Sequence, residues 1–263
     1  MPADPGGRAP FEGSLGGAAV TYDGLDAPAL AARLGVPRLE LYAAVASTQD
    51  VAHALAEAGA PDGTVVLADA QTGGRGRAGR AWASPPGSGV WLTVVTRPHD
   101  LAAFEVLALR VGLMLAEALA SYAHGPLGVK WPNDLLVGGR KLAGILVEAR
   151  WRDGRPEWAA VGVGVNVRPP SSFEGAAALR ADASRLDALV ATVGAVCTAA
   201  AAWGGLDADE LRALTARDVV RGRRVSAPVA GVAAGVAANG ALLVRDAAGV
   251  VHEIRQAQVT FAA

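Results

Sequence analysis

A glycine- and arginine-rich segment, QTGGRGRAGRAW at residues 71–82, is the first candidate for chemistry in this chain. Glycines let backbone N–H groups approach a ligand, and arginines pair bidentately with carboxylate or phosphate oxygens. Residues 74–79 spell G-x-G-x-x-G, but AWASPPGSG follows where dinucleotide binding requires a helix. A triphosphate loop is excluded because Arg80 and Ala81 replace its lysine and hydroxyl residue. The segment predicts an anion-binding loop of another kind, mobile until a ligand orders it.

A second candidate is the pair of lysines in GVKWPNDLLVGGRKLAGILVE. Lys130 and Lys141 are the only lysines among the 24 basic residues of the chain, and both lie in this segment. An ammonium group is a compact point charge, whereas a guanidinium is a planar fork. We therefore expect that both positions require an ammonium group.

Composition restricts the possible function classes. The 263 residues are 52% hydrophobic with a net charge of −1, which is typical of a soluble globular protein of one or two domains. A nucleic-acid role would need a local basic patch, and the arginine/glycine segment is single rather than repeated. Cys197 is the only cysteine, so no intramolecular disulfide can form, and a reducing cytoplasm is expected. The four scattered histidines lack metal-ligand spacing, and neither a secretory signal nor a membrane span is expected.

Hydrophobic periodicity and turn residues predict the elements that position these segments. The predicted helices are 26–34, capped by Asp26 and closed by Gly35, then 47–58 with Ser47 as N-cap, 101–120, about 182–203, and 209–216. The predicted strands are 64–69, 89–96, 129–131, 135–137, 140–150 and 158–167.

The pattern of apolar and turn residues changes near residue 218. Short apolar runs follow, with an Asn-Gly turn at 239–240, and they predict a small all-β module. The expected fold is therefore α+β: a mixed β-sheet with helices packed on one side, then a small SH3-like β-barrel. We expect a tail and short helix over 1–40, a catalytic domain over 41–216 and the barrel over 217–263.

Five motifs in order carry a family resemblance. GGRGRAGRAW, VKWPND and RKLAGILVE, with STQ at 47–49 before them and GVGVNV at 162–167 after them, resemble the biotin protein ligases (biotin–acetyl-CoA-carboxylase ligases). The resemblance runs from about residue 41 to the C-terminus. It implies a class II synthetase-like catalytic domain followed by an SH3-like domain.

The resemblance also implies a two-step reaction. Biotin and ATP, with Mg²⁺, give biotinyl-5′-AMP, and a lysine of a biotin carboxyl carrier protein or domain then accepts the biotinyl group. The carriers belong to acyl-CoA or pyruvate carboxylases. Catalysis rests on positioning and charge stabilisation. We expect a monomer or weak homodimer with no dedicated metal site.

The implied biotin contacts combine polar donors and acceptors for the ureido ring with an apolar wall and a cation for the carboxylate. Ser47 also fits a plain N-cap, and Trp91 also fits a core tryptophan. The biotin-binding residues are Ser47, Thr48, Gln49, Gln71, Gly74, Arg75, Gly76, Arg77, Trp91, Lys141 and Gly144.

The implied nucleotide contacts are arginines, lysines and amides, with Trp82 packed over the nucleotide. They are Arg77, Arg80, Trp82, Lys130, Asn133, Lys141 and Asn166. Arg77, Lys141 and Asp134 are the predicted catalytic residues. Asn133 and Asp134 suit magnesium, the ribose or deprotonation of the incoming lysine, and these alternatives stay open.

Two other functions compete with this reading. A lipoate-type protein ligase shares the catalytic fold, but it would lack the arginine-rich loop in this form. Some biotin ligases also act as repressors through an N-terminal helix-turn-helix. Only one short helix is predicted before STQ, and a helix-turn-helix needs two, so we expect no DNA binding.

Overall fold

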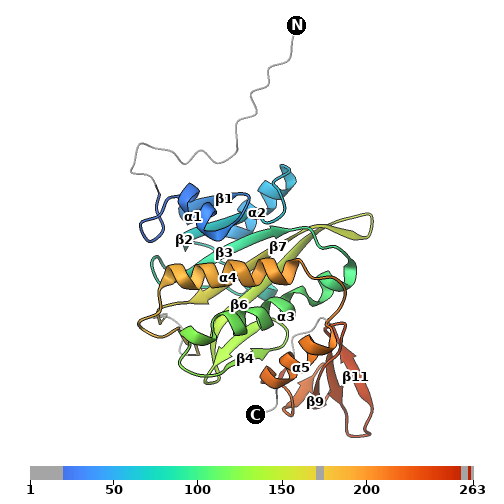
Figure 1. Ribbon diagram of the computed structural model, residues 1–263. Helices are drawn as coiled ribbons and strands as arrows, with labels where there is room; N and C mark the ends of the chain where they lie inside the picture. The colour runs from blue at the N-terminus through green and yellow to red at the C-terminus, as the bar shows by residue number, and fades with distance from the viewer. Residues whose placement is uncertain (1–19, 170–174, 256–259, 262–263) are drawn as a thin grey trace.

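The computed structural model describes residues 20–169, 175–255 and 260–261, and its largest element is a mixed seven-stranded sheet (Figure 1). The strand order is β1-β2-β3-β7-β6-β5-β4. Neighbouring strands are antiparallel except for β1 and β2, which are parallel. The strands are β1 (Leu39–Val45), β2 (Val65–Gln71), β3 (Gly89–Thr96), β4 (Leu127–Lys130), β5 (Asp134–Val137), β6 (Arg140–Arg152) and β7 (Arg155–Asn166).

Strand β1 is absent from the predicted elements. It pairs with β2 from Leu39↔Val65 to Val45↔Gln71, and α2 (Thr48–Glu57) makes the crossover between them. Only Leu39 in this strand is fully buried, so the segment lacks the alternation that marks a strand. The predicted domain boundary at residue 40 falls inside β1. Most of the predicted N-terminal tail lies outside the described residues.

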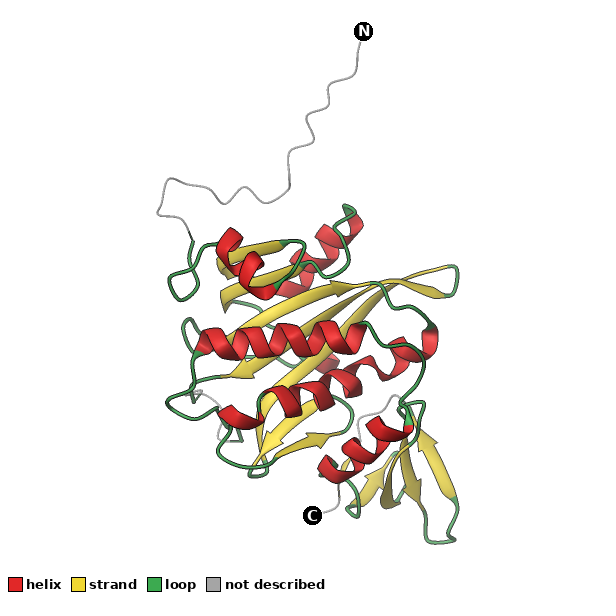
Figure 2. Cartoon of the chain, in the orientation of Figure 1, coloured by secondary structure: helices red, strands yellow, loops and turns green. Residues whose placement is uncertain are grey.

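Helices cover both faces of the large sheet, so the expectation of helices on one side is wrong. Helices α3 (Leu101–Ala118) and α4 (Arg185–Ala200) lie side by side across one face (Figures 1 and 2). Alternate residues of β2 separate the two faces. Val65 and Leu67 join the core beneath α3 and α4, whereas Val66 packs with residues of α2 on the opposite face.

The inner strand β3 is buried on both faces, because α2 covers one and α4 covers the other. All of its residues, GVWLTVVT, are buried. A strand covered on two sides reads as a continuous apolar run rather than as an alternation. This explains why the strand was predictable from the sequence, although the packing of α2 against its second face was not.

Side-chain caps fix the helix starts, and the caps predicted at Asp26 and Ser47 are confirmed. Asp26 accepts a hydrogen bond from the backbone N–H of Ala29, and Ser47 accepts one from Gln49. Gly35 ends α1 (Ala27–Leu34) with a left-handed φ of 66°. The other short elements are α5 (Ala208–Arg217) and the 3₁₀ turns η1 (Arg77–Gly79) and η2 (Ala120–Tyr122).

A smaller five-stranded sheet follows α5, in the order β11-β10-β9-β8-β12 (Figure 1). The predicted Asn-Gly turn joins β9 to β10, where Gly240 has a φ of 79°. This sheet confirms the predicted β module, and its closure into an SH3-like barrel remains a prediction. Its strands are β8 (Arg224–Ala227), β9 (Gly231–Val236), β10 (Leu242–Arg245), β11 (Val251–Ile254) and β12 (Thr260–Phe261).

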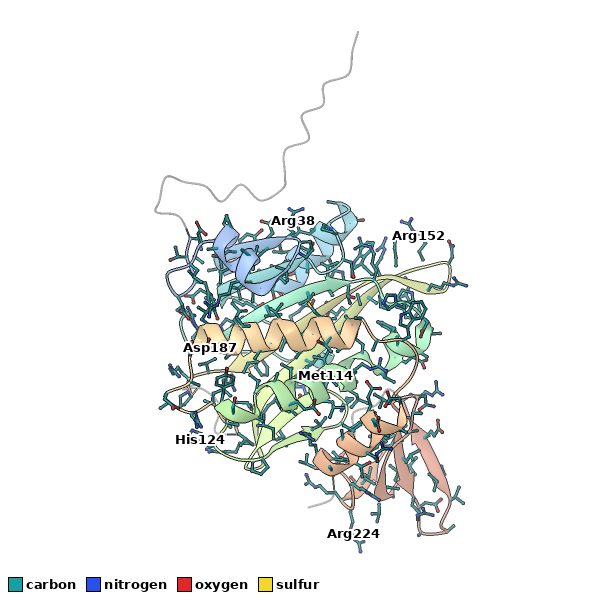
Figure 3. All side chains as sticks on the ribbon, in the orientation of Figure 1. Arg38, Met114, His124, Arg152, Asp187 and Arg224 are labelled. Atoms are coloured by element: carbon teal, nitrogen blue, oxygen red, sulfur yellow. The ribbon has the colours of Figure 1, made fainter. Side chains whose placement is uncertain are left out.

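Two buried polar contacts attach this smaller sheet and α5 to the large one. Trp131 donates its indole N–H to the carbonyl of Gly240 at 3.0 Å. Arg110 of α3, only 2% exposed, pairs with Glu210 of α5 and donates to the carbonyl of Gly205. A buried guanidinium needs such partners to offset its desolvation. The far end of the β6–β7 hairpin, by contrast, extends into solvent, where Arg152 is exposed (Figure 3).

Candidate active site

The centre of the candidate site is a strip of glycines on the α2 face of the large sheet. Gly144 of β6 and Gly164 of β7 are direct cross-strand neighbours. A Cβ atom added at Gly164 would lie 2.6 Å from the indole of Trp82, and one at Gly144 would lie 3.0 Å from it. The Trp82 ring therefore lies flat against bare backbone, a close approach that only glycine permits.

Trp82 is packed against its neighbours, but its buried indole N–H makes no hydrogen bond within the described residues. The ring meets Trp91 edge to face, with centroids 6.4 Å apart, and Trp91 donates its own N–H to the carbonyl of Pro85. An unpaired buried donor of this kind costs about 1–3 kcal/mol. The two indoles lie together beside the strip. Trp91 is only 2% exposed, which fits the alternative of a core tryptophan, and its predicted contact with biotin remains a prediction.

The predicted catalytic residues Lys141 and Asp134 are in contact. Nζ of Lys141 lies 2.7 Å from Oδ1 of Asp134 and 5.0 Å from the centroid of the Trp82 ring. Asp134 is the cross-strand neighbour of Gly144 on one side and of Lys130 on the other. Lys141 thus pairs with a carboxylate at the glycine strip, and Lys130 lies opposite that carboxylate in the register of the next strand.

The glycine- and arginine-rich loop folds as a hairpin that places Trp82. The N–H of Trp82 donates to the carbonyl of Gly74 at 2.8 Å, and the N–H of Gly76 donates to Arg80 at 2.7 Å. A Cβ at Gly74 would lie 2.5 Å from the Trp82 carbonyl, so this position also requires glycine. The glycines predicted to admit a ligand therefore also close the loop upon itself.

Arg77 is the loop arginine whose charge is least compensated. Its pKa is lowered chiefly by burial and by the positive charge of Arg80, and the carboxylate of Asp134 opposes these effects. Within the part of the chain that the structure describes, no hydrogen bond or ion pair engages its guanidinium. A half-buried cation in this state favours an anionic ligand. Arg77 and Lys141 both lie near Asp134, whereas Arg80 is exposed and donates to the carbonyl of Arg77.

The two predicted asparagines brace the strand that carries Lys141. Asn133 donates its side-chain amide to the carbonyl of Ile145 at 2.7 Å. Asn166, 5% exposed, donates to the carbonyls of Ala177 at 3.0 Å and of Lys141 at 3.4 Å. Asn166 thus binds β6 at Lys141, and Asn133 binds the same strand just after Gly144. Their predicted contacts with the nucleotide remain predictions.

A chain of hydrogen bonds joins the predicted ureido-binding residues. Thr48 donates its backbone N–H and its hydroxyl to Oε1 of Gln71, and Gln71 donates its amide to Oγ of Ser84 at 2.8 Å. Thr93 completes the chain with its hydroxyl 2.8 Å from that of Thr48. Ser47 is buried as the N-cap of α2. These residues lie together as expected, and the chain fixes the start of α2 to the loop.

Gln49 has a different neighbourhood from the one predicted for a biotin contact. Its amide donates to the carbonyls of Leu146 and Ala160, at 3.0 and 3.4 Å, and it packs over Gly162. Gln49 therefore ties α2 to β6 and β7. Its own carbonyl oxygen is buried without a partner among the described residues.

Several site residues were missed by sequence reasoning. Thr93 and Ser84 belong to the hydrogen-bond chain, and Asp50 and Glu148 bind Arg75. The signal for Thr93 is a polar residue inside an apolar strand, because such a residue needs a buried partner. His53 belongs to none of the five motifs. It accepts from the indole of Trp158 beside a surface hollow of about 400 Å³ between α2 and the β6–β7 hairpin.

Two further absences concern the described residues alone. Over 20–169 and 175–255, no three His, Cys, Asp or Glu side chains gather where they could hold a metal ion. A magnesium ion carried by a nucleotide needs only one or two carboxylates, and Asp134 is the carboxylate at the strip. In the same part of the chain, no helix combines the length and the apolar character of a membrane span.

Comparison with known proteins assigns the segment that carries this site. Residues 41–166 match the Biotin/lipoate A/B protein ligase family. This segment is a domain of that family. The ligase domain thus includes every predicted site residue, from Ser47 to Asn166.

Curated relatives of the ligase domain include a Bifunctional ligase/repressor BirA and a Biotin--[acetyl-CoA-carboxylase] ligase. The first, from Bacillus subtilis, is 40% identical over 131 residues, which is 49% of this chain and 40% of the relative. The second, from Mycobacterium tuberculosis, is 39% identical over 139 residues, which is 51% of this chain and 50% of the relative. The chain therefore spans half or less of the length of these relatives.

The likeness of fold extends beyond the ligase domain. The structure of a biotin protein ligase from Aquifex aeolicus in complex with biotin and ATP matches with a TM-score of 0.71 and 25% identity. The match covers 86% of this chain and 99% of the other. The mixed sheet with its helices is thus the fold of a solved biotin protein ligase.

Proposed function

We propose that this protein is an ATP-dependent ligase that activates biotin as biotinyl-5′-AMP and transfers it to a lysine of a biotin carboxyl carrier domain. The observation that carries this proposal is Lys141 beside Asp134 and Trp82 on the glycine strip, with Arg77 nearby. The family assignment of residues 41–166 and the names of the relatives support the choice of substrate.

In the first step a carboxylate oxygen of biotin bonds to the α-phosphorus of ATP, and pyrophosphate leaves with the electrons of the broken P–O bond. Both reactants are anionic, so the protein must bring like charges together. Lys141 and Arg77 supply the positive charge at this point. The ammonium of Lys141 can follow an oxygen as it changes from carboxylate to anhydride. Magnesium would arrive with ATP and reduce its charge.

In the second step the amine of the acceptor lysine bonds to the acyl carbon, and AMP leaves with the electrons of the C–O bond. The amine must lose a proton, and Asp134 is the carboxylate nearest the site. One of its oxygens is already engaged by Lys141 at 2.7 Å. Contact with magnesium, contact with the ribose and proton acceptance therefore remain alternatives for Asp134.

The setting of the reaction follows from the same proposal. The acceptor would be a carrier protein or domain of an acyl-CoA or pyruvate carboxylase. We expect the protein to work in the cytoplasm as a monomer or weak homodimer, without binding DNA. A gel-shift assay with biotin and ATP that shows sequence-specific, salt-resistant DNA binding would contradict the last expectation.

A lipoate-type ligase is the second candidate, because the matched family includes both chemistries. The test incubates the protein with ATP, magnesium and a biotin carboxyl carrier domain, with either biotin or lipoate, and measures intact mass. We expect one biotinyl group on one lysine, and none on a carrier whose acceptor lysine is replaced by arginine. Lipoyl transfer to its own carrier without biotinyl transfer selects the second candidate. Transfer of neither acid overturns both.

A further inference from the structure

The three arginines of the loop have three different environments. Arg75 donates from Nη1 and Nη2 to the two carboxylate oxygens of Asp50, at 2.9 and 2.7 Å. Arg77 is half-buried near Asp134, and Arg80 donates its Nε to the carbonyl of Arg77. Resemblance to known ligases assigns Arg75 to biotin binding, whereas the structure directs its guanidinium toward α2.

A second carboxylate binds Arg75 from another element. Oε2 of Glu148, in β6, lies 3.6 Å from Nη2 of Arg75 and 3.5 Å from Nε2 of His53. Two anionic groups therefore surround one cation, so Arg75 has little charge left for an anionic ligand. The hydrogen bond from Arg75 lowers the pKa of Asp50. The pKa of Glu148 is lowered mainly by its hydrogen bond with His53 and to a smaller extent by the charge of Arg75.

The partners of Arg75 also explain how a glycine-rich loop holds one shape. Asp50 lies in the first turn of α2, and Glu148 lies in the sheet, so the two fix the loop to separate rigid elements. Ordering a loop with this much glycine has a large entropic cost. Exposed ion pairs usually contribute little, but a bidentate arginine within a network is the exception.

We propose that Arg75 is the anchor of the loop, held by Asp50 and Glu148 as positioning residues, and that it does not touch the ligand. The anchor lies two residues before Arg77 and next to the Gly74–Trp82 hydrogen bond. Fixing Arg75 on the α2 side thus turns Arg77 and Trp82 toward Lys141. The effect on catalysis rests on the proposed biotin ligase function, whereas the effect on the loop does not.

A double-mutant cycle tests the anchor. Asp50→Ala, Arg75→Ala and the double variant are compared with wild type by calorimetric biotin titration and by steady-state adenylation. We expect each single change to raise the biotin Kd and KM about fivefold, which is the scale of one good ion pair. The double variant should match Arg75→Ala, because without Arg75 the carboxylate of Asp50 has no further part in the anchor. The kcat should change less than about twofold.

The matched control is Glu57→Ala, an exposed carboxylate on the same helix, which should leave Kd and KM unchanged. The proposal fails if Arg75→Ala is far more damaging than Asp50→Ala, or if Asp50→Ala tightens biotin binding. Either result would mean that Arg75 leaves Asp50 to contact the ligand. Additive effects in the double variant would also overturn it.

A ligand-free measurement separates this proposal from the proposed function. Trypsin should cut at Arg77 and Arg80 faster in Asp50→Ala than in wild type or Glu57→Ala, because the released loop opens. Equal cleavage rates overturn the anchor whatever the substrate is. Wild-type protein that binds no biotin, with faster cleavage in Asp50→Ala, would reject the biotin ligase and retain the anchor.

Discussion

Lys141 and Asp134 form an ion pair across neighbouring strands, with Nζ 2.7 Å from Oδ1, while the ammonium also lies over the Trp82 ring. The carboxylate thus holds the ammonium at the glycine strip before any ligand arrives. An incoming carboxylate or phosphate must compete with Asp134 for this charge. A cation already held in position loses little freedom on binding, which favours catalysis by positioning.

Replacing Lys141 by alanine should reduce adenylation strongly without unfolding the protein. The side chain is partly exposed near the start of β6, so little packing is lost. We expect the rate of biotin-dependent ATP–pyrophosphate exchange to fall about 10²–10³-fold. Arg140→Ala removes the exposed neighbouring cation of the same strand and should leave the rate unchanged. Equal rates for the two variants would exclude Lys141 from the reaction.

Arg77→Ala should lower the exchange rate about 10²-fold, because this half-buried guanidinium lies near Asp134 without a hydrogen bond or ion pair to any residue that the structure describes. The matched control is Arg152→Ala at the exposed end of the β6–β7 hairpin (Figure 3). Circular dichroism should be unchanged in both. A wild-type rate in Arg77→Ala would remove the proposed role in charge stabilisation.

Gly164→Ala should displace Trp82, because the new Cβ would meet the indole at 2.6 Å. We expect a loss of stability of about 1–3 kcal/mol and weaker biotin binding. Gly194→Ala is the control: it lies exposed in α4 with nothing within 4 Å, and it should stabilise the fold by about 0.5–1 kcal/mol. Urea denaturation measures both. Unaltered stability of Gly164→Ala would mean that Trp82 does not rest on this strip.

The contribution of Asp50 to stability should depend on pH in the acid range. Its pKa is lowered in the folded protein by the hydrogen bond from Arg75. Its contribution is therefore complete above the unfolded value of about 3.9 and is lost as the pH falls through the folded value. The difference in urea midpoint between wild type and Asp50→Asn should be constant from about pH 7 to 5 and should decrease as the pH falls below about 4. A difference that stays constant or grows as the pH falls further below about 4 contradicts the assignment.

Much of the fold was predictable because local rules agree with it. The caps at Asp26 and Ser47, the buried run of β3 and the Asn-Gly turn all depend on neighbours in sequence. Strand β1 was not predictable, because it is defined by pairing with β2 across a whole helix. The face of the sheet that α2 covers was not predictable either, because it depends on how the strands pair and not on the sequence of the helix.

The candidate site also has a part that the sequence predicts and a part that it does not. Motif order indicated that Lys141, Asp134, Arg77 and Trp82 belong together, and they do lie at one strip. The partners of Gln49 and Arg75 could not be predicted, because a polar side chain in a motif fits a ligand and a backbone carbonyl equally well. Which partner it meets depends on strands 97 and 111 residues away, in the case of Gln49.

The bare backbone at Gly144 and Gly164 limits how the site of this protein can evolve. Glycine is the smallest residue, so every substitution at these positions adds atoms, and the nearest ring is already within 3.0 Å of the first added carbon. Mutation can therefore only fill this space and never enlarge it. Variation that admits a bulkier acid must therefore arise in the side chains around the strip, such as Trp82, rather than in the glycines themselves.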